Sequence, residues 1–259
     1  MKRAWMPIVA PIALALILLA GWALTTTPGA IPSYVVPTPL AVVKKLIGGL
    51  VTYADMWSFI GTTLVESLAG CAVGILIGIP FAVVIYRSRL VSAAVVPFLG
   101  ATQAIPAVAI APVLVLWMAS GFWRIVALCA IMVFFPILVS SLVGLRHVDR
   151  DVLSAALVDG AGSWARLIHI EIPLALPNIL AGVRNGFTLS ITGAVVGEMV
   201  MGGEGLGSLL MIQRNANDTA GMFATIIALA VLAAGVYSLV ALVEKRWASS
   251  MEIIKETRS

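Results

Sequence analysis

The chain has 259 residues, of which 61% are hydrophobic and only 11% are charged, and its formal net charge is +4. Soluble domains carry about 25% charged residues and at most about half apolar ones. The composition therefore excludes an ordinary soluble protein and favours a chain that lies largely in a membrane.

The charged residues are clustered, and the long gaps between the clusters predict membrane-spanning helices. A helix needs about 20 apolar residues to cross a hydrocarbon core of about 30 Å. Inside lipid the helix also pairs every backbone group within the segment. The predicted fold class is an all-α polytopic membrane protein in a single domain, 1–259, with about six transmembrane helices. These spans are residues 7–24, 60–86, 97–119, 122–144, 176–201 and 221–243.

The basic residues predict the orientation of these spans. With the N-terminus in the cytoplasm, most of them fall inside, namely Lys2, Arg3, Arg87, Arg89, Arg146, Arg150, Arg166, Lys245, Arg246, Lys255 and Arg258. Those that fall outside are Lys44, Lys45, Arg124 and Arg214. This is the positive-inside pattern, and it predicts that both termini are cytoplasmic. It also explains the positive net charge without a nucleic-acid partner.

The first predicted span resembles a secretory signal peptide, because Lys2 and Arg3 precede an apolar run. It is longer than a usual signal-peptide core, and no small-x-small cleavage site follows, so a retained span is favoured. The stretch from Thr25 to Pro39 is rich in Pro and Thr and is expected to form an external loop. Thr38 and Pro39 are then expected to begin a short helix that runs through Leu46.

The second span carries a glycine pattern that predicts close helix packing. Gly70, Gly74 and Gly78 recur every four residues on one helix face, and Glu66 lies one turn earlier on the same face. Small residues let helix backbones approach closely inside a membrane. The alternative is that glycine is simply common in membrane helices.

The third span contains prolines that predict an irregular helix. Pro97, Pro106 and Pro112 each lack the N–H that a helix interior needs, so the segment is expected to bend. Such breaks in membrane helices can mark a moving element or a transport path. A static kink is the alternative interpretation.

A polar insert between Arg146 and Pro173 is too hydrophilic to span and is expected to lie in the cytoplasm. Asp149 or Asp151 can cap a short helix that runs through Ala155 and Ala156. Gly160 and Gly162 are expected to end this helix. The alanines would give it a flat face that fits a groove on another protein.

A second short helix is predicted from Trp164 to Ile170, and it is expected to end before Pro173 because the residue before proline disfavours the helical conformation. An amphipathic helix on the lipid surface is the alternative interpretation. The charges of the insert are mixed rather than a basic stripe, which argues against lipid binding. The insert is therefore predicted to bind a protein.

This insert resembles the E-A-A-x3-G-x9-I-x-L-P signature of ABC importer permeases. Ala155, Ala156, Gly160, Ile170 and Pro173 occur at the same spacing. The sequence departs from the signature where Ser154 replaces Glu and Ile172 replaces Leu, and the serine removes a charge that could pair with the ATPase. The resemblance implies a cytoplasmic coupling loop over 146–173, with ATPase-coupling residues Ser154, Ala155, Ala156, Asp159, Gly160, Ile170 and Pro173.

The resemblance covers nearly the whole chain, through the segments Pro37–Pro39, Thr63–Leu68, Gln103–Pro106, Phe135–Pro136 and Gly193–Glu198. They are similar to the permeases for nitrate, taurine, sulfonate, pyrimidine thiamin-precursor and riboflavin uptake. This family implies a type I importer bundle in a bacterial inner membrane. It also implies a second permease copy as a homodimer, cytoplasmic ABC ATPases and an extracytoplasmic solute-binding protein.

Among these solutes, Glu66 and the run Val196–Glu198 favour a pyrimidine precursor or a riboflavin-like compound by analogy. Sulfonate, taurine or nitrate import is the alternative. The chain is not expected to be an enzyme, because no Lys follows a Gly as an ATP-binding P-loop requires. His147 and His169 do not form a metal pair, and no cofactor is expected.

Several polar residues at membrane depth are candidates for the substrate path, since polar groups inside a membrane by default indicate function. They are Glu66, Gln103, Asn185, Thr188, Thr192 and Glu198. Asn185, Thr188 and Thr192 share one helix face. In the alternative interpretation, Glu198 is solvated at the outer interface and the threonines bond only to their own helix.

A different class of function, an ion-coupled secondary transporter, would need a charge pair at mid-membrane or inverted repeats. The apolar gaps are nearly free of charge, and the two halves of the chain do not match. A membrane enzyme would need a nucleophile and base or a metal site, and no such set of residues is present. The sequence therefore favours an ABC importer permease.

Overall fold

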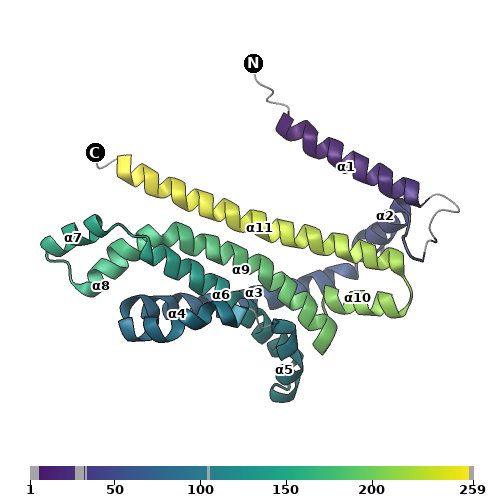
Figure 1. The fold of residues 1–259 in the computed structure, drawn as a ribbon. Coiled ribbons are helices and arrows are strands. Elements are labelled where there is room, and N and C mark those ends of the chain that lie inside the picture. Colours follow the sequence, from purple (N-terminus) through teal and green to yellow (C-terminus); the bar gives the residue numbers. More distant parts are fainter. Residues whose placement is uncertain (1–5, 27–31, 33, 104–105, 257–259) are drawn as a thin grey trace.

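The computed structural model describes residues 6–26, 32, 34–103 and 106–256. These residues form helices joined by short connections, which confirms the all-α prediction (Figure 1). In chain order the elements are α1 Met6–Thr25, α2 Pro39–Ile47, the π-turn η1 Gly48–Thr52, α3 Met56–Arg87, α4 Arg89–Gln103, the 3-10 turn η2 Ala107–Ile110, α5 Ala111–Trp117, α6 Gly121–Arg146, α7 Arg150–Val158, α8 Ser163–Arg166, the π-turn η3 Leu167–Glu171, α9 Ile172–Met201, α10 Leu206–Asn215 and α11 Thr219–Glu256.

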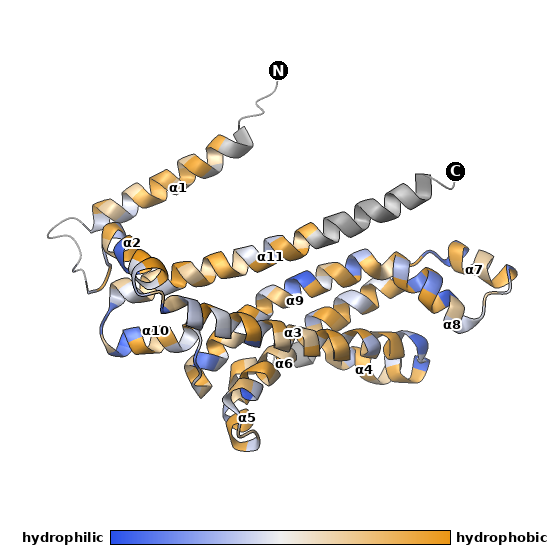
Figure 2. Ribbon diagram, turned by 180° about the vertical axis from the view of Figure 1, so that it is seen from behind, coloured by the Kyte–Doolittle hydropathy of each residue, from blue (hydrophilic) through white to orange (hydrophobic). Residues whose placement is uncertain are grey.

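Four helices in the described part are long and apolar enough to cross a membrane. They are α3, α6, the continuous helix Ser163–Met201 and the Thr219–Leu242 part of α11. Figure 2 shows mostly hydrophobic residues along these helices, with hydrophilic ones in part of α9 and in α2, α8 and α10. The predicted second, fourth, fifth and sixth spans thus each lie within one long helix, and α1 contains the first.

The predicted third span, 97–119, is wrong as a single helix. The chain instead forms α4, then η2, then α5, and the apolar helical parts are short. Pro106 precedes η2 in an extended conformation, with a ψ of 114°, and Pro112 lies in the first turn of α5. Pro106 has no N–H to donate, and its ring would strike the carbonyl one turn back, so the helix breaks there. Pro97, by contrast, lies inside α4.

Three long helices, α3, α6 and α9, form the centre of the bundle, and α6 packs extensively on the other two. The α3 glycines face α6. A Cβ at Gly70 would overlap Cys129, one at Gly74 would overlap Val133, and one at Gly78 would lie 3.3 Å from Ile137. The absence of these side chains is what allows the close contact of α3 with α6.

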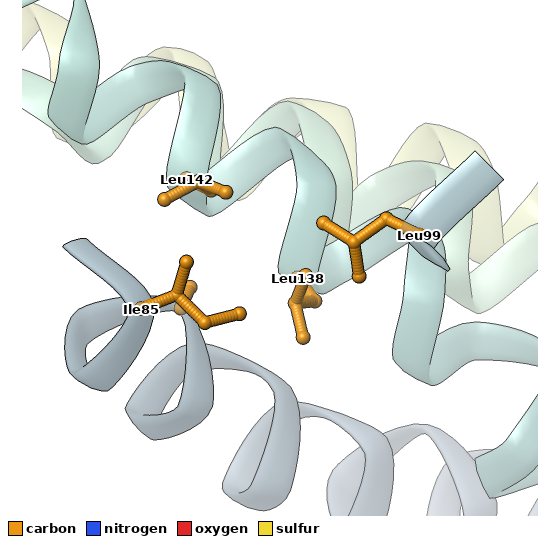
Figure 3. Close-up of a cluster of buried hydrophobic side chains, with 5 residues drawn as sticks. Ile85, Leu99, Leu138 and Leu142 are labelled. Atoms are coloured by element: carbon orange, nitrogen blue, oxygen red, sulfur yellow. The ribbon is translucent and has the colours of Figure 1, made fainter. Parts of the chain in front are cut away.

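A buried apolar cluster joins α4 to this centre. Ile85 of α3, Leu99 of α4, and Leu138 and Leu142 of α6 converge on one another, as Figure 3 shows, together with Ala82. Ile85 and Leu138 are fully buried. The cluster holds α4 against α3 and α6, although the helix itself ends at Gln103.

The bundle has two distinct ends. The C-terminus of α11 lies at the same end as α7 and α8, whereas α2 and α10 lie at the opposite end (Figure 1). There the indole Nε1 of Trp22 in α1 donates a hydrogen bond of 3.0 Å to the Pro37 carbonyl. The Trp22 ring also stacks on Phe223 of α11, with ring centres 5.9 Å apart. We call these the α7–α8 end and the α10 end.

Candidate functional site

The α7–α8 end carries the insert that the sequence singled out. Asp149 caps α7, because its side chain accepts a hydrogen bond of 2.9 Å from the Asp151 N–H. The helix ends at Val158, and Gly160 follows with a φ of +80°. This left-handed conformation suits glycine, because a side chain would meet the backbone. Gly160 is therefore the bend between α7 and α8.

The second short helix of the insert does not end where the sequence predicted. α8 continues through the π-turn η3 directly into α9, with no break before Pro173. The Ile172 N–H donates to the Leu167 carbonyl, five residues back rather than four. This wider turn gives the Pro173 ring room inside a continuous helix. The prediction of a helix end before Pro173 is wrong because a π-turn was not foreseen.

The exposed surface of α7 and α8 mixes apolar side chains with the charged side chains of Arg150, Asp151 and Asp159. Ala155 is exposed, but Ala156 is buried, so the two alanines do not form one face. The Ser154 hydroxyl donates to the Arg150 carbonyl at 2.8 Å and thus bonds within its own helix. Large apolar side chains add to this surface: the exposed fractions are 58% for Leu157, 88% for Val158 and 72% for Trp164.

A buried carboxylate anchors this surface to the bundle. Glu171 in η3 is fully buried, and its Oε1 lies 2.8 Å from Nε of Arg166 in α8. Its Oε2 lies 3.4 Å from Nη2 of Arg87 at the end of α3. The same Arg87 guanidinium donates to the Ser163 carbonyl at 2.6 Å. A buried carboxylate needs such partners to offset its lost hydration, so these contacts fix α8 to α3.

Polar side chains form an exposed stripe along α9. Asn185, Thr188 and Thr192 are all exposed, on the face that helical spacing brings together. The hydroxyls of Thr188 and Thr192 lie 3.5 Å and 3.4 Å from carbonyls of their own helix, at the limit of a hydrogen bond. They therefore remain available to other partners. Gln103 is the last residue of α4, and its side chain lies outside the described part.

Glu198 and Glu66 lie elsewhere, in a buried polar cluster near the α10 end. Oε1 of Glu198 accepts a bond of 2.8 Å from the Thr63 hydroxyl, and its Oε2 accepts one of 2.5 Å from the Gly207 N–H. Thr63 in turn accepts from the Leu206 N–H at 2.8 Å. Glu198 is 1% exposed, so it is not solvated at an interface. The cluster fastens the start of α10 to α3 and α9.

Glu66 lies one turn along α3 from Thr63 and is 3% exposed. Its Oε2 is buried and has no hydrogen-bond partner among the described residues. Neither Glu66 nor Glu198 belongs to the exposed stripe of α9. The six candidates for a substrate path thus divide into a surface set on α9, a buried pair, and Gln103.

The sequence was then compared with known proteins. Residues 74–249 match the family model described as "Binding-protein-dependent transport system inner membrane component". The riboflavin transport system permease protein RibX of Chloroflexus aurantiacus is 34% identical over 249 residues, which cover 95% of this chain and 92% of that protein. The chain belongs to the binding-protein-dependent ABC permease family.

Two further similarities agree with this assignment. The permease is 32% identical over 199 residues to the formylaminopyrimidine transport permease protein ThiX of Halalkalibacterium halodurans, covering 77% of this chain and 79% of that protein. A chain of the MetNI methionine ABC transporter superposes with a TM-score of 0.64 at 16% identity, covering 74% of this chain and 96% of that one. The MetNI similarity concerns the fold.

Membership of this family has direct consequences. The permease is a multi-pass inner-membrane protein and the transmembrane subunit of an ABC importer, not itself an enzyme. Its partners are an ATPase and a binding protein. The family resemblance found in the sequence is thereby confirmed.

Sequence reasoning missed the residues that position the permease insert. In the sequence, Glu171 contributes only to the mixed charges of the insert. An acidic residue beside an apolar run could nevertheless have indicated a buried ion pair. Thr63 carried no signal for its contact with Glu198, which is 135 residues away in the sequence. The exposed Leu157, Val158 and Trp164 could have been identified as apolar residues in an otherwise polar insert.

Proposed function

We propose that this permease imports a flat heteroaromatic solute of the riboflavin or pyrimidine-precursor class. The observation that carries the proposal is the similarity over 95% of the chain to a permease named for riboflavin transport. A second relative is named for formylaminopyrimidine transport. Both named solutes are nitrogen heterocycles that carry ring carbonyl, ring nitrogen or amino groups.

The coupling loop 146–173 is the proposed ATPase contact. The exposed surface of Ala155, Leu157, Val158 and Trp164 offers shape and apolar area, and Ser154 supplies no charge in place of the family Glu. Asp159 is exposed beside it, while Ile170 in η3 and Pro173 at the start of α9 are half-buried. The proposed contact therefore combines apolar packing with the exposed charges of Arg150 and Asp159.

The proposed orientation places the α7–α8 end and both termini in the cytoplasm. The positive-inside pattern of basic residues supports it. The proposed assembly is a homodimer, in which the exposed polar stripe of α9 faces the partner copy and the solute path rather than lipid. Exposed polar side chains at membrane depth are costly against lipid but not against water, and this supports the arrangement.

The proposed mechanism is alternating access. ATP binding closes the ATPase pair and moves the attached α7 and α8. Because α8 runs through η3 into α9 without a break, this motion passes directly to the polar stripe. Two states of one rigid element, biased by a partner, are sufficient for such a switch.

Reconstituted uptake tests the proposal. The permease, its ATPase and its binding protein are placed in vesicles, and import of riboflavin, a hydroxymethylpyrimidine, taurine and nitrate is compared with and without ATP. We expect ATP-dependent import of one or both heterocycles and no import of taurine or nitrate. Import of taurine or nitrate instead would reassign the solute. Import driven by an ion gradient without ATP would reject the mechanism.

A further inference from the structure

A pocket of about 550 Å³ opens at the α10 end, between α2, η1, α10 and the first turns of α11. Its lining includes Lys44, Gly48, Gly49, Tyr53, Asp55 and Gln213. Small-molecule sites commonly have volumes of about 300–1,000 Å³. The pocket lies at the opposite end of the bundle from the coupling loop (Figure 1). Neither the coupling loop nor the α9 stripe contributes to it.

Irregular backbone holds the rim of this pocket in place. The π-turn η1 leads into Ala54, whose φ of 57° is in the left-handed region. This conformation costs a residue with a side chain about 1 kcal/mol or more. The residues on either side of Ala54 are Tyr53 and Asp55, and both line the pocket. Both π-turns and strained residues are found most often at functional sites.

The rim combines an aromatic ring with free charges. Tyr53 is 78% exposed. Lys44 and Asp55 are exposed, and neither forms an ion pair with another described residue. The adjacent Lys45, in contrast, is paired with Asp218 at 2.6 Å. The pocket therefore presents a stacking surface, a cationic donor and an anionic acceptor that the fold itself does not use.

Gln213 adds a neutral amide to the pocket. Its Oε1 accepts a bond of 2.9 Å from the Thr225 hydroxyl, which fixes the amide and leaves its NH₂ group to donate. A planar ring with alternating N–H and C=O groups matches this set. Its N–H can donate to Asp55, its carbonyl oxygens can accept from Lys44 and Gln213, and its face can stack on Tyr53.

We infer that this pocket is a reception site for a planar heteroaromatic solute, which it holds before the solute enters the α9 path. The inference rests on the proposed function, because riboflavin and pyrimidine precursors carry such rings. The concave shape favours a small solute over a protein partner, whose contact would cover about 800 Å² on each side. Gly48, Gly49 and Gly221 also line the pocket.

Riboflavin fluorescence anisotropy provides the test, because bound riboflavin tumbles with the nanodisc whichever side chain stands at position 53. The permease–ATPase complex in nanodiscs, without binding protein, is titrated with riboflavin. We expect a saturable rise in anisotropy in the wild type and about tenfold weaker binding in Tyr53→Ala, since stacking on an aromatic side chain is worth about 1–3 kcal/mol and each 1.4 kcal/mol is tenfold. Asp55→Asn should also weaken binding. Tyr53→Phe keeps the ring and should bind as the wild type does.

Tyr34→Ala is the matched control. Tyr34 is 74% exposed at the same end but does not line this pocket. Its backbone carbonyl accepts a hydrogen bond from the Thr219 hydroxyl, and the substitution preserves this bond. We expect wild-type riboflavin binding in this variant. Thermal unfolding of each variant shows whether a loss of binding reflects a loss of fold.

The inference is overturned if the wild type does not bind riboflavin, or if Tyr53→Ala and Tyr34→Ala bind equally well. It is also overturned if Lys44→Gln and Tyr53→Ala leave riboflavin binding unchanged but weaken stimulation of the ATPase by the binding protein, because the surface is then a protein contact. Uptake in the same preparation separates the two proposals. ATP-driven riboflavin import without Tyr53-dependent binding rejects only the reception site, whereas absence of import rejects the proposed solute.

Discussion

A single backbone angle distinguishes the two glycines of the coupling loop. Gly160 has a φ of +80° and Gly162 a φ of −63°, and neither has another atom within 4 Å of an added Cβ. An alanine at either position therefore meets no neighbouring atom, and only the backbone conformation can oppose the substitution. Gly160→Ala should cost about 1 kcal/mol locally and shift the bend between α7 and α8.

We expect Gly160→Ala to reduce co-purification of the ATPase and to lower uptake severalfold, while Gly162→Ala behaves as the wild type. The measurements are the ATPase yield on a tagged permease and transport in vesicles. Equal behaviour of the two variants would show that the bend does not determine docking.

The buried Glu171 makes a second prediction at the residue scale. Glu171→Ala leaves Arg166 and Arg87 without their shared carboxylate. Breaking a fully buried pair costs about 3–5 kcal/mol. The two arginine side chains are 18% and 25% exposed, so water moderates the loss, and a smaller effect is expected.

Glu171→Ala should lower the unfolding temperature and loosen the coupling loop, so that ATP hydrolysis is no longer matched by transport. Glu204→Ala removes an exposed carboxylate and serves as the control. The ratio of ATP hydrolysed to solute imported is the measurement. An unchanged ratio in Glu171→Ala would contradict an anchoring role.

Asp218 links α2 to the start of α11 and makes a pH prediction. Partial burial raises the pKa of Asp218, but the hydrogen bonds from Lys45 and the Gly221 N–H, with the Lys45 charge, outweigh burial and lower the pKa below its usual value. A lowered folded pKa stabilises the fold above the unfolded pKa of about 3.9, and this stability is lost as the pH falls through the folded value.

The stability difference between the wild type and Asp218→Asn should therefore stay constant from pH 5 to 8 and shrink below about pH 4. It should be small throughout, because the side chains of Lys45 and Asp218 are 54% and 29% exposed. Thermal unfolding across this pH range is the measurement. A difference that changes between pH 5 and 8 would point to another titrating group.

At the scale of elements, the contact between α3 and α6 depends on glycine. A Cβ at Gly70 would overlap the Cβ of Cys129 and lie 3.1 Å from the Val126 carbonyl, which is backbone and cannot turn aside. Gly61 in the same helix has no atom within 4 Å of an added Cβ. The two positions thus form a matched pair for alanine substitution.

Gly70→Ala should force α3 and α6 apart and cost about 1–3 kcal/mol, as overpacking usually does. Gly61→Ala should be neutral or stabilise by up to about 1 kcal/mol, because alanine is the better helix former. Unfolding temperatures in detergent or nanodiscs provide the comparison. Equal temperatures for the two variants would mean that α6 can move without cost.

Some of these elements could be predicted from the sequence, and others could not. Long apolar segments predicted α1, α3, α6, α9 and α11, because the length of a spanning helix is set by the bilayer. Local chemistry predicted the Asp149 cap and the Gly160 bend. The break at Pro106 and the continuity at Pro173 could not be predicted, since proline permits either outcome and neighbouring packing decides. The contacts of Glu171 with Arg87 and of Glu198 with Thr63 join distant segments, so the sequence does not indicate these partners.

At the scale of the whole molecule, the functional features lie far apart along one bundle. The coupling loop occupies one end, the proposed reception site the other, and the α9 stripe runs between them (Figure 1). The Glu171 cluster fixes α3 at one end of α9, and the Glu198 cluster fixes α3 and α10 at the other. Because both clusters tie α9 to α3, we expect α3 and α9 to move together as one unit.

In the proposed arrangement, the ATPase contact and the solute path involve different residues, so substitutions can affect one without the other. Thr188→Val and Thr192→Val remove hydroxyls from the stripe but keep side-chain volume and leave both end clusters intact. We expect the double variant to import solute several times more slowly, while stimulation of the ATPase by the binding protein stays near the wild-type value. Gly160→Ala, in contrast, should reduce both, because it lies in the proposed ATPase contact.

Thr62→Val is the control for the stripe, since Thr62 is a half-buried threonine of α3 that lies outside the stripe and bonds its own helix at 3.1 Å. It should transport normally. Asn185→Leu extends the test along the same face and should slow import further, because it replaces an amide with an apolar group in a path that a polar solute must cross. Wild-type import by the threonine and asparagine variants would place the path elsewhere in the assembly and leave the α9 stripe facing lipid.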